Sequence, residues 1–315
     1  MKNYIVFDLE WNQCPFGKER EIRTLPFEIV EIGAVKLNDK KEEIGRFREL
    51  VRPKAYTSLH FKTKEIISLC EQDLDNARSF PEVFADFISW CGEQPLYCTW
   101  GPGDLLEFQR NIRYHGLENP FPKPLFFYDI QKIFSIVYED RKSRRTLEHA
   151  IDFLNLPKED TFHSALDDAC YTAAVLSHID SEDILRNYSI DYFQAPQTRK
   201  EEIYVVFDTY SKFVSKEFTS RTEAMKDRKV TSTRCYLCNQ SAKRKIRWFT
   251  SGGKNYFSLS YCEEHGWLKG KIRIKKSEDG KYFCVKTLKL ITAQEAQEIC
   301  ARKESAHLKK LLKKN

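Results

Sequence analysis

Asp8 and Glu10 are the first residues of the chain whose types and spacing could do chemistry. They follow the apolar run from Tyr4 to Phe7, which is typical of a buried strand. Side chains alternate along an extended strand, so both carboxylates lie on one face and can converge on a metal ion. Buried carboxylates are costly unless they are paired, protonated or bound to a cation. For this fragment alone, a strand end with two solvated acids is the alternative interpretation.

Asp104 lies where an expected strand, residues 95–100, meets an expected helix. The intervening Gly101-Pro102-Gly103 ends the strand and opens the helix, which continues to about Gly116. An acid at such a junction can reach a site at the edge of a sheet. It can also be a cap or a first-turn acid that the helix dipole favours.

The segment from Phe162 to Leu176 begins at a polar turn and continues as a helix. It opens with His163 and then carries Asp167 and Asp168. Small residues on this helix allow close packing against a sheet, which would direct its early acids toward those of the first strand. Taken alone, the histidine is compatible with a structural role and the acids with ordinary early-helix positions. The small residues are Ala165, Ala169, Ala173 and Ala174.

The elements expected around these acids alternate between strands and helices, which favours an α/β fold. Residues 28–37 and 43–51, separated by Asn38-Asp39, predict an antiparallel hairpin that extends the sheet of the first strand. The remaining expected elements are a strand at 125–129 and helices at 63–71, 80–91, 130–138 and 146–154.

The acids and the histidine, in this order, resemble the DnaQ-like 3′-5′ exonucleases of the four-acid, one-histidine (DEDDh) type. The resemblance rests on Asp8-x-Glu10, on Asp104 at its strand-to-helix junction, and on His163 with Asp168 five positions later. It covers roughly residues 1–180 and implies a ribonuclease H-like α/β fold with a mixed five-stranded sheet flanked by helices. It also implies a hydrolase that shortens single-stranded nucleic acid from the 3′ end.

The resemblance also implies roles for these residues. Phosphodiester hydrolysis needs a nucleophilic hydroxide and stabilisation of the charge on the attacking and leaving oxygens. Two Mg2+ or Mn2+ ions about 3.5–4 Å apart can supply both, and carboxylates are suitable ligands for these ions. Asp8 would bind both ions. Glu10 and Asp168 would bind the ion that activates water, and Asp104 would support the second ion. His163 would be the general base that takes the proton of the water.

Two alternatives concern the fourth acid and the activity itself. Asp167 is the rival of Asp168, although the family's spacing places the acid five positions after the histidine. The motifs at 100–104 and 163–168 look most like the Eri-type branch, whose members trim RNA 3′ ends, so RNA is favoured over DNA. The second function class is an inactive adaptor of the same fold. The presence of all five candidate residues argues against it.

Charge is distributed unevenly along the 315 residues. Residues 201–315 hold 26 Lys and Arg against 13 Asp and Glu, and residues 1–200 hold 26 against 33. A basic half could hold a polyanion, although lysines could also simply keep a small domain soluble. We expect an exonuclease domain at 1–180, a linker at 181–200 and a basic zinc-binding domain at 201–315.

The composition, with 41% hydrophobic and 31% charged residues, is that of a soluble globular protein. There is no run of 18 apolar residues, and the first residues lack the pattern of a signal peptide. Cysteines of the first half are scattered irregularly, which favours reduced thiols. We therefore expect a cytoplasmic protein without a membrane partner.

Four residues of the second half have the spacing of a metal site. Cys235-x-x-Cys238 is followed, after 23 residues, by Cys262-x-x-His265. This separation predicts one tetrahedral Cys3His zinc site in a cytoplasmic protein, the alternative being two coincidental pairs.

Expected hairpins at 245–261 and 270–288, followed by a C-terminal helix at 292–314, resemble a zinc ribbon. Because such a domain has little core of its own, the zinc ion would contribute directly to its folding. Basic residues here alternate with aromatic ones, which suits phosphate contacts and base stacking on RNA or single-stranded DNA. A protein partner for this domain is the other interpretation. The residues concerned are Lys243, Arg244, Lys245, Arg247, Lys271, Arg273, Lys275 and Lys276, with Trp248, Phe249 and Tyr256.

Overall fold

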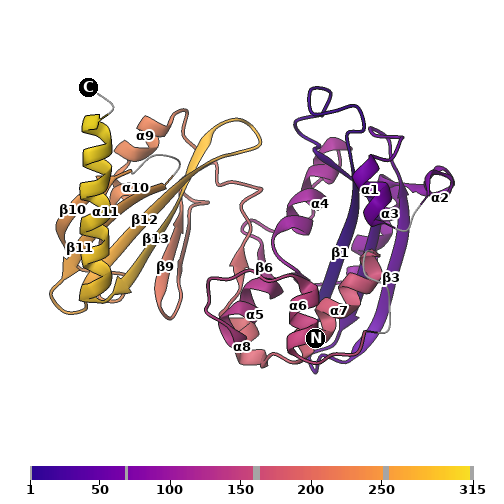
Figure 1. Cartoon of the computed structure of the whole chain (residues 1–315), viewed down its shortest axis with the longest axis horizontal. Coiled ribbons are helices and arrows are strands. Elements are labelled where there is room, and N and C mark those ends of the chain that lie inside the picture. The colour runs from indigo at the N-terminus through magenta and orange to yellow at the C-terminus, as the bar shows by residue number, and fades with distance from the viewer. Residues whose placement is uncertain (1, 68–69, 159–163, 251–254, 313–315) are drawn as a thin grey trace. The chain divides into compact units, whose positions relative to one another are not determined.

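The computed structural model of the chain forms two compact units, Met1–Asp191 and Tyr192–Asn315 (Figure 1). Among the described residues, no helix has the length and apolar character needed to cross a membrane. The cytoplasmic location stays a prediction. The structure describes all residues except 1, 68–69, 159–163, 251–254 and 313–315.

The first unit is built on a mixed sheet. Its strands are β1 (Tyr4–Gln13), β2 (Phe27–Leu37), β3 (Glu43–Arg52), β4 (Arg78–Ser79), β5 (Leu96–Thr99), β6 (Phe126–Asp129) and β7 (Ser189–Ile190). They lie in the order β4-β3-β2-β1-β5-β6-β7, with β1 antiparallel to β2 and parallel to β5. The five longer strands form the sheet that was expected, and the two-residue strands β4 and β7 extend its edges to seven strands.

Helices cover both faces of this sheet (Figure 1). They are α1 (Phe61–Ile66), α2 (Glu71–Asp75), α3 (Phe80–Cys91), α4 (Gly103–Tyr114), α5 (Ile130–Tyr138), α6 (Leu147–Phe153), α7 (Ala165–Ser177) and α8 (Ser181–Arg186). Alternation along β1 sends Tyr4 and Val6 into a core with α5, α6 and α7. Ile5 and Phe7 enter a second core with α3 and α4. Asp8 therefore points to the face that α7 covers.

Local signals set several of the helix ends. The Ser79 N–H donates to the Glu82 carboxylate in the capping box that begins α3, and Gly92, with φ 78°, ends that helix. The expected helix at 63–71 is instead split into α1 and α2, because Ile67 adopts extended backbone (φ −92°, ψ 141°) at the end of α1.

Gly33 lets α7 lie directly on β2. A Cβ atom at this position would come within 2.1 Å of the Ala165 carbonyl carbon and of the Leu166 nitrogen. Both are backbone atoms of α7, so no larger residue fits without displacing the helix. Gly33 also stands opposite Asp8 in the β1–β2 register. The start of α7 is therefore brought against the sheet at the level of the first acid of β1.

The first unit extends beyond the boundary expected at residue 180. The segment 181–200 was expected to be a linker, but its first part contains α8 and β7. Ile184 of α8 is fully buried in the core that includes α5 and α7, and β7 pairs with β6. Only one residue of α8 is buried, so the mostly polar sequence gave no periodic apolar pattern from which this helix could be predicted.

The second unit is a six-stranded antiparallel sheet, which is larger than the two hairpins of the expected zinc-ribbon-like domain. Its strands are β8 (Ile203–Val206), β9 (Tyr210–Val214), β10 (Lys243–Phe249), β11 (Asn255–Cys262), β12 (Gly266–Lys276) and β13 (Tyr282–Ile291), in the order β10-β11-β12-β13-β9-β8. Its helices are α9 (Arg221–Lys226), α10 (Arg228–Thr231) and α11 (Ala293–Leu312). The expected strand pairs β10–β11 and β12–β13 are present. The sheet has its own core, which includes Ile272 and Cys284, so the expectation of a nearly coreless domain is corrected.

We expect Gly33→Ala to destabilise the first unit by about 3 kcal/mol or more, because overpacking costs about 1–3 kcal/mol even where side chains can adjust. Gly45→Ala is the matched control, since its added Cβ would meet only the Trp90 side chain at 3.7 Å. Urea unfolding followed by circular dichroism measures both variants. Equal losses of stability would contradict the role assigned to Gly33.

Candidate active site

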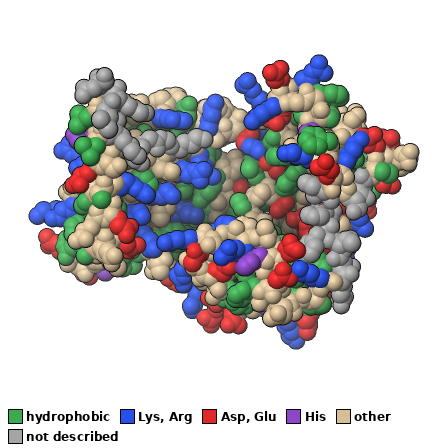
Figure 2. All heavy atoms as spheres, in the orientation of Figure 1, with side chains coloured by type: hydrophobic (Ala, Val, Ile, Leu, Met, Phe, Trp, Pro, Cys, Tyr) green, Lys and Arg blue, Asp and Glu red, His purple; other side chains and the backbone are tan. Residues whose placement is uncertain are grey.

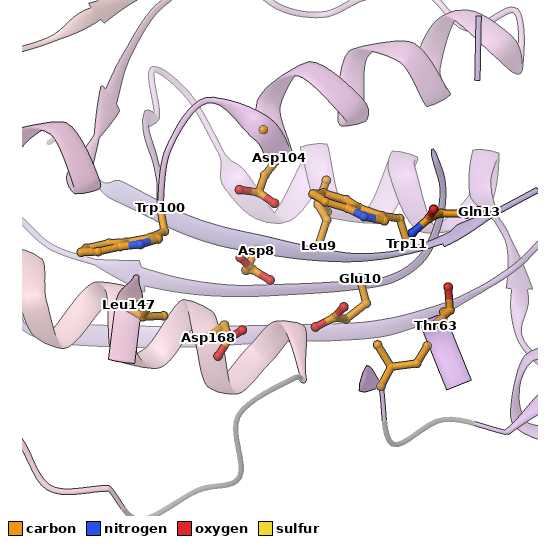
Figure 3. A pocket seen from close by; sticks show the side chains of 12 residues that line it. Asp8, Leu9, Glu10, Trp11, Gln13, Thr63, Trp100, Asp104, Leu147 and Asp168 are labelled. Carbon is orange, nitrogen blue, oxygen red and sulfur yellow. The ribbon is translucent and has the colours of Figure 1, made fainter. Parts of the chain in front are cut away.

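A cleft of about 370 Å³ opens at the end of β1. Figure 3 shows side chains from β1, α4 and α7 pointing toward one another in this cleft. The structure thus brings together the four acids that the sequence singled out and surrounds them with apolar walls. The acids are Asp8, Glu10, Asp104 and Asp168, and the apolar residues include Trp11, Ile67, Trp100 and Leu147.

Asp8, Glu10 and Asp168 form the tightest part of this cluster. One carboxylate oxygen from each lies within 4.8 Å of the others, an arrangement that could hold a metal ion. Asp8 and Glu10 share a face of β1 because strand side chains alternate, and Asp168 lies in the first turn of α7. Among the described residues, Asp167 belongs neither to this group nor to the cleft lining. Asp168 is therefore the aspartate of α7 that faces the other acids.

Asp104 faces the same cleft from the start of α4 but is not part of that group of three. It is 6% exposed, and the backbone N–H groups of Asp104 and Leu9 favour its charged form. Burial nevertheless raises the pKa of Asp104 to about 7, and the charge of Asp168 adds to the rise.

The other acids raise one another's pKa in the same way. Burial is the largest cause for Asp8, whose pKa lies well above its ordinary value, followed by the charges of Asp104 and Asp168. Burial also raises the pKa of Glu10 to about 8, with Asp168 and Glu31 as the next causes. A cation would relieve this repulsion. Because every candidate metal-ligand atom is a carboxylate oxygen, the site fits hard divalent ions such as Mg2+ or Mn2+.

Glu31 is a buried acid beside the site that sequence reasoning missed. It stands opposite Glu10 in the β1–β2 register and is 1% exposed. One oxygen pairs with Arg48 at 2.7 Å, and the other accepts a hydrogen bond from the Ala165 N–H at 3.4 Å. Glu31 thus holds the first residue of α7, and with it Asp168, against the strands. Its position inside an otherwise apolar strand was the signal that could have identified it.

Asn12 fixes another part of the cleft. It is fully buried, and its side-chain amide donates to the carbonyl oxygens of Tyr56 and Ser58 at 2.9 Å each. Its side-chain oxygen accepts a hydrogen bond from the His60 N–H at 2.9 Å. His60 is the N-cap of α1, which contributes Thr63 to the cleft. A single buried amide therefore positions the segment that leads into this wall.

Two tryptophans form much of the apolar lining. Trp11 packs against Phe27 with ring centroids 5.4 Å apart, and Trp100 packs against Phe134 at 6.1 Å. Both indole rings also line the cleft, on opposite sides of the acids in Figure 3. The cleft therefore combines negative charge with aromatic surfaces.

His163, the expected general base, lies outside the described residues. The described chain resumes at Ser164, the N-cap residue of α7. Asp168 is in the first turn of this helix, so the spacing of five positions ends on an acid that lines the cleft.

The expected zinc ligands, Cys235, Cys238, Cys262 and His265, come together in the second unit within 4.8 Å of one another. The Sγ atoms of Cys235 and Cys262 lie 3.7 and 3.8 Å from Nδ1 of His265, and the Sγ atoms of Cys238 and Cys262 are 3.6 Å apart. Ligands around a tetrahedral zinc ion, with Zn–S about 2.3 Å and Zn–N about 2.0–2.1 Å, are separated by roughly 3.5–3.8 Å. The group therefore fits an ion such as zinc.

The region that carries the cleft matches a known family. The exonuclease family (RNase_T) matches residues 5–176, which is more than half of the chain. This span contains all four acids of the cleft and His163.

Curated relatives share the same region. The protein named "Probable 3'-5' exonuclease KapD", from Bacillus subtilis (strain 168), is 28% identical over 173 residues, which cover 52% of this chain and 78% of that protein. The 3'-5' exoribonuclease 1 of Mus musculus is 28% identical over 152 residues, covering 45% of this chain and 44% of the relative. The match thus spans less than half of the mouse protein.

Solved structures share the fold. The nuclease domain of 3'hExo, a DEDDh family member bound to rAMP, has a TM-score of 0.50 and 22% identity, covering 60% of this chain and 96% of that one. A full-length 3'-exonuclease also has a TM-score of 0.50, with 21% identity over 58% of this chain and 83% of that one. At these identities the likeness supports the ribonuclease H-like fold alone. Because the family match spans more than half of the sequence and includes every acid of the cleft, this chain belongs to the exonuclease (RNase_T) family of hydrolases that act on phosphodiester bonds.

Proposed function

We propose that this protein is a metal-dependent exonuclease that removes nucleotides from the 3′ end of single-stranded nucleic acid, with RNA favoured over DNA. The observation that carries the proposal is the convergence of Asp8, Glu10 and Asp168 in the cleft of an exonuclease-family chain. The similarity to a 3'-5' exoribonuclease supports the preference for RNA.

The arrangement of the acids suits two divalent ions. Asp8 lies between Asp104 on one side and Glu10 and Asp168 on the other (Figure 3). With two ions bound, Asp8 would contact both, Glu10 and Asp168 would hold the first, and Asp104 would support the second. When bound, Mg2+ or Mn2+ would supply a nucleophilic hydroxide and stabilise charge on the attacking and leaving oxygens.

The remaining residues have roles that need no metal. His163 would take the proton of the attacking water on an imidazole nitrogen, a role that suits a pKa near neutrality. Trp11 and Trp100 would offer aromatic faces on which the bases at the end of a strand stack, and stacking tolerates any sequence. A strand end held between them would present its last phosphodiester to the acids.

An inactive adaptor of the same fold fits these observations less well. Such a protein needs no acid cluster, and carboxylates held within 4.8 Å of one another repel and reduce stability. A metal-dependent reaction explains why the cluster is present despite this cost.

For the second unit we propose one structural zinc ion. All four corners of its tetrahedron would be protein ligands, which is typical of structural sites. The ion would join the segment of Cys235 and Cys238 to Cys262, the last residue of β11, and to His265 in the turn before β12.

We expect the purified protein to shorten a 5′-labelled single-stranded RNA from its 3′ end with Mg2+ or Mn2+, to act more slowly on the matching DNA, and to stop when a chelator is added. Asp8→Ala should lower the rate by roughly 10²–10³ or more, because a group that stabilises transition-state charge is lost. Gel analysis of the product ladder measures this. No degradation of either polymer by the wild type would contradict the proposed activity.

The two neighbouring aspartates of α7 provide a matched pair of variants for the same assay. Asp168→Asn should lower the rate of RNA degradation far more than Asp167→Asn, because Asp168 lines the cleft and Asp167 does not. The reverse order would assign the fourth acid to Asp167.

We expect Asp8→Asn to raise the unfolding temperature of the metal-free protein, by about 2–4 °C for each kcal/mol of repulsion removed. Burial raises the folded-state pKa of Asp8, so its ionisation penalises the fold above the unfolded pKa, and the penalty grows until the folded pKa is passed. The gain should therefore be larger at pH 8 than at pH 5.

Differential scanning fluorimetry measures this effect. Adding Mn2+ should stabilise the wild type and have little effect on Asp8→Asn, because only the wild type has the complete ligand set. A metal-free Asp8→Asn variant that is less stable than the wild type at both pH values would show that repulsion among the acids does not limit the stability of the fold.

We expect carefully purified protein to contain one zinc ion per chain and Cys262→Ser to lose it. Cys300→Ser is the matched control, since this exposed thiol lies outside the ligand group. Because the six-stranded sheet has its own core, loss of zinc should lower the unfolding temperature without abolishing the strand signal in circular dichroism. Substantially less than one zinc per wild-type chain would count against the site.

A further inference from the structure

One face of the second sheet carries a group of cations. Along β12, Leu268, Ile272 and Ile274 enter the cores of the unit, and the residues between them point to the opposite face. The cations on this opposite face of β9, β12 and β13 are called the basic face. They are Lys212, Lys269, Lys271, Arg273, Lys275 and Lys289.

The strand register places these cations side by side. Lys269 stands directly opposite Lys289, and Lys271, Thr287 and Lys212 lie in one row across three strands. Successive same-face positions along β12 are about 6.6–6.8 Å apart. Figure 2 shows Lys and Arg side chains gathered over this part of the sheet, beside α11. Like charges placed opposite one another destabilise a sheet, so these cations do not contribute to the stability of the second unit.

The helix α11 covers only the neighbouring part of this face. Its Ala296 and Ile299 pack against Leu259 of β11. Arg302, from the same helix, lies over the Phe257 ring at 4.7 Å and adds a cation at the border. Further along β12 and β13, the basic side chains stay partly or fully exposed.

Two exposed cations of the basic face lack a counter-charge within the described part of the chain. Lys271 and Arg273 form no ion pair with any described residue. Burial and then the charge of Arg302 lower the pKa of Lys269, with Glu295 opposing them. A polyanion would relieve this mutual repulsion.

Tyr192 adds an aromatic surface to the basic face. The Nζ atoms of Lys275 and Lys212 lie 4.3 and 5.7 Å from its ring centroid. Lys212 is also 5.9 Å from the centroid of Phe207, which stacks on Tyr210 at 4.6 Å. Cations interleaved with aromatic rings suit a nucleic acid better than an acidic peptide, because bases can stack where peptide carboxylates cannot.

We propose that the basic face binds the sugar-phosphate backbone of single-stranded nucleic acid, as a second binding surface that shares no residue with the catalytic cleft. The proposal rests on the proposed function for the identity of the polymer. Flexible lysine side chains contact phosphates without reading sequence. The face would therefore increase affinity for long strands while the chemistry remains at the 3′ end.

The test is fluorescence anisotropy with a labelled single-stranded RNA of about 20 nucleotides, longer than most single-strand binding sites. The full chain is used with Asp8→Asn, so that binding is measured without cleavage. The double variant Lys271→Gln, Arg273→Gln removes two exposed cations of the face. The control Lys226→Gln, Arg228→Gln removes two exposed cations from α9 and α10, whose Ala224 and Val230 pack on the opposite side of the sheet.

We expect the test variant to bind about tenfold more weakly near 0.15 M salt, and the slope of log affinity against log salt to fall by about 1.4, or 0.7 for each lost phosphate contact. The control variant should bind like the parent. Lys289→Gln, a single substitution at an exposed position, should give a smaller loss of the same kind. Circular dichroism of all variants checks that the sheet is intact.

Two outcomes would overturn the proposal. One is equal binding by the test and control variants. The other is competition by polyglutamate as effective as that by RNA at equal charge, which would assign the face to an acidic protein. The binding assay is independent of the proposed activity. If the activity is absent, the RNA stays intact with the wild-type protein. If the basic face does not bind RNA, the test variant gives the same anisotropy titration as the control variant.

Discussion

The first unit depends on holding several buried carboxylates close together although they repel one another. Three features oppose this repulsion. Gly33 allows α7 to lie on the sheet, Glu31 holds the first residue of that helix, and the Leu9 N–H favours the charged form of Asp104. The first two set the distance of Asp168 from β1. The same scaffold that makes the metal-free site unfavourable would favour the binding of the proposed divalent ions.

Local rules predicted part of the arrangement of this site, and the resemblance to a known family supplied the choice of Asp104 and Asp168. Alternation along a strand placed Asp8 and Glu10 on one face, and the small residues of α7 predicted its close approach. Contacts between residues far apart in the sequence were not predictable in this way. Glu31 depends on Arg48 from the next strand, and the buried amide of Asn12 holds a segment more than forty residues later. Such pairings require the folded sheet.

In the second unit, too, local features were predictable from the sequence and contacts between distant segments were not. The spacing of the four expected zinc ligands was enough to predict their convergence, because short pairs of this kind close a site locally. The extent of the sheet was underestimated, since β9 joins its far edge by pairing with β13, and β8 then pairs with β9. For the same reason the basic face could not be recognised from composition. Lys212 comes from a strand about sixty residues before Lys271, and only the register aligns the two.

Binding of divalent ions by Asp8 and its neighbours can be measured by a Mn2+ titration followed by the electron paramagnetic resonance of the free ion. We expect two Mn2+ ions per wild-type chain at the site. We expect Asp8→Asn to lose at least one ion, with an unchanged circular dichroism spectrum. Undiminished Mn2+ binding by a correctly folded Asp8→Asn variant would show that this acid does not hold the ions.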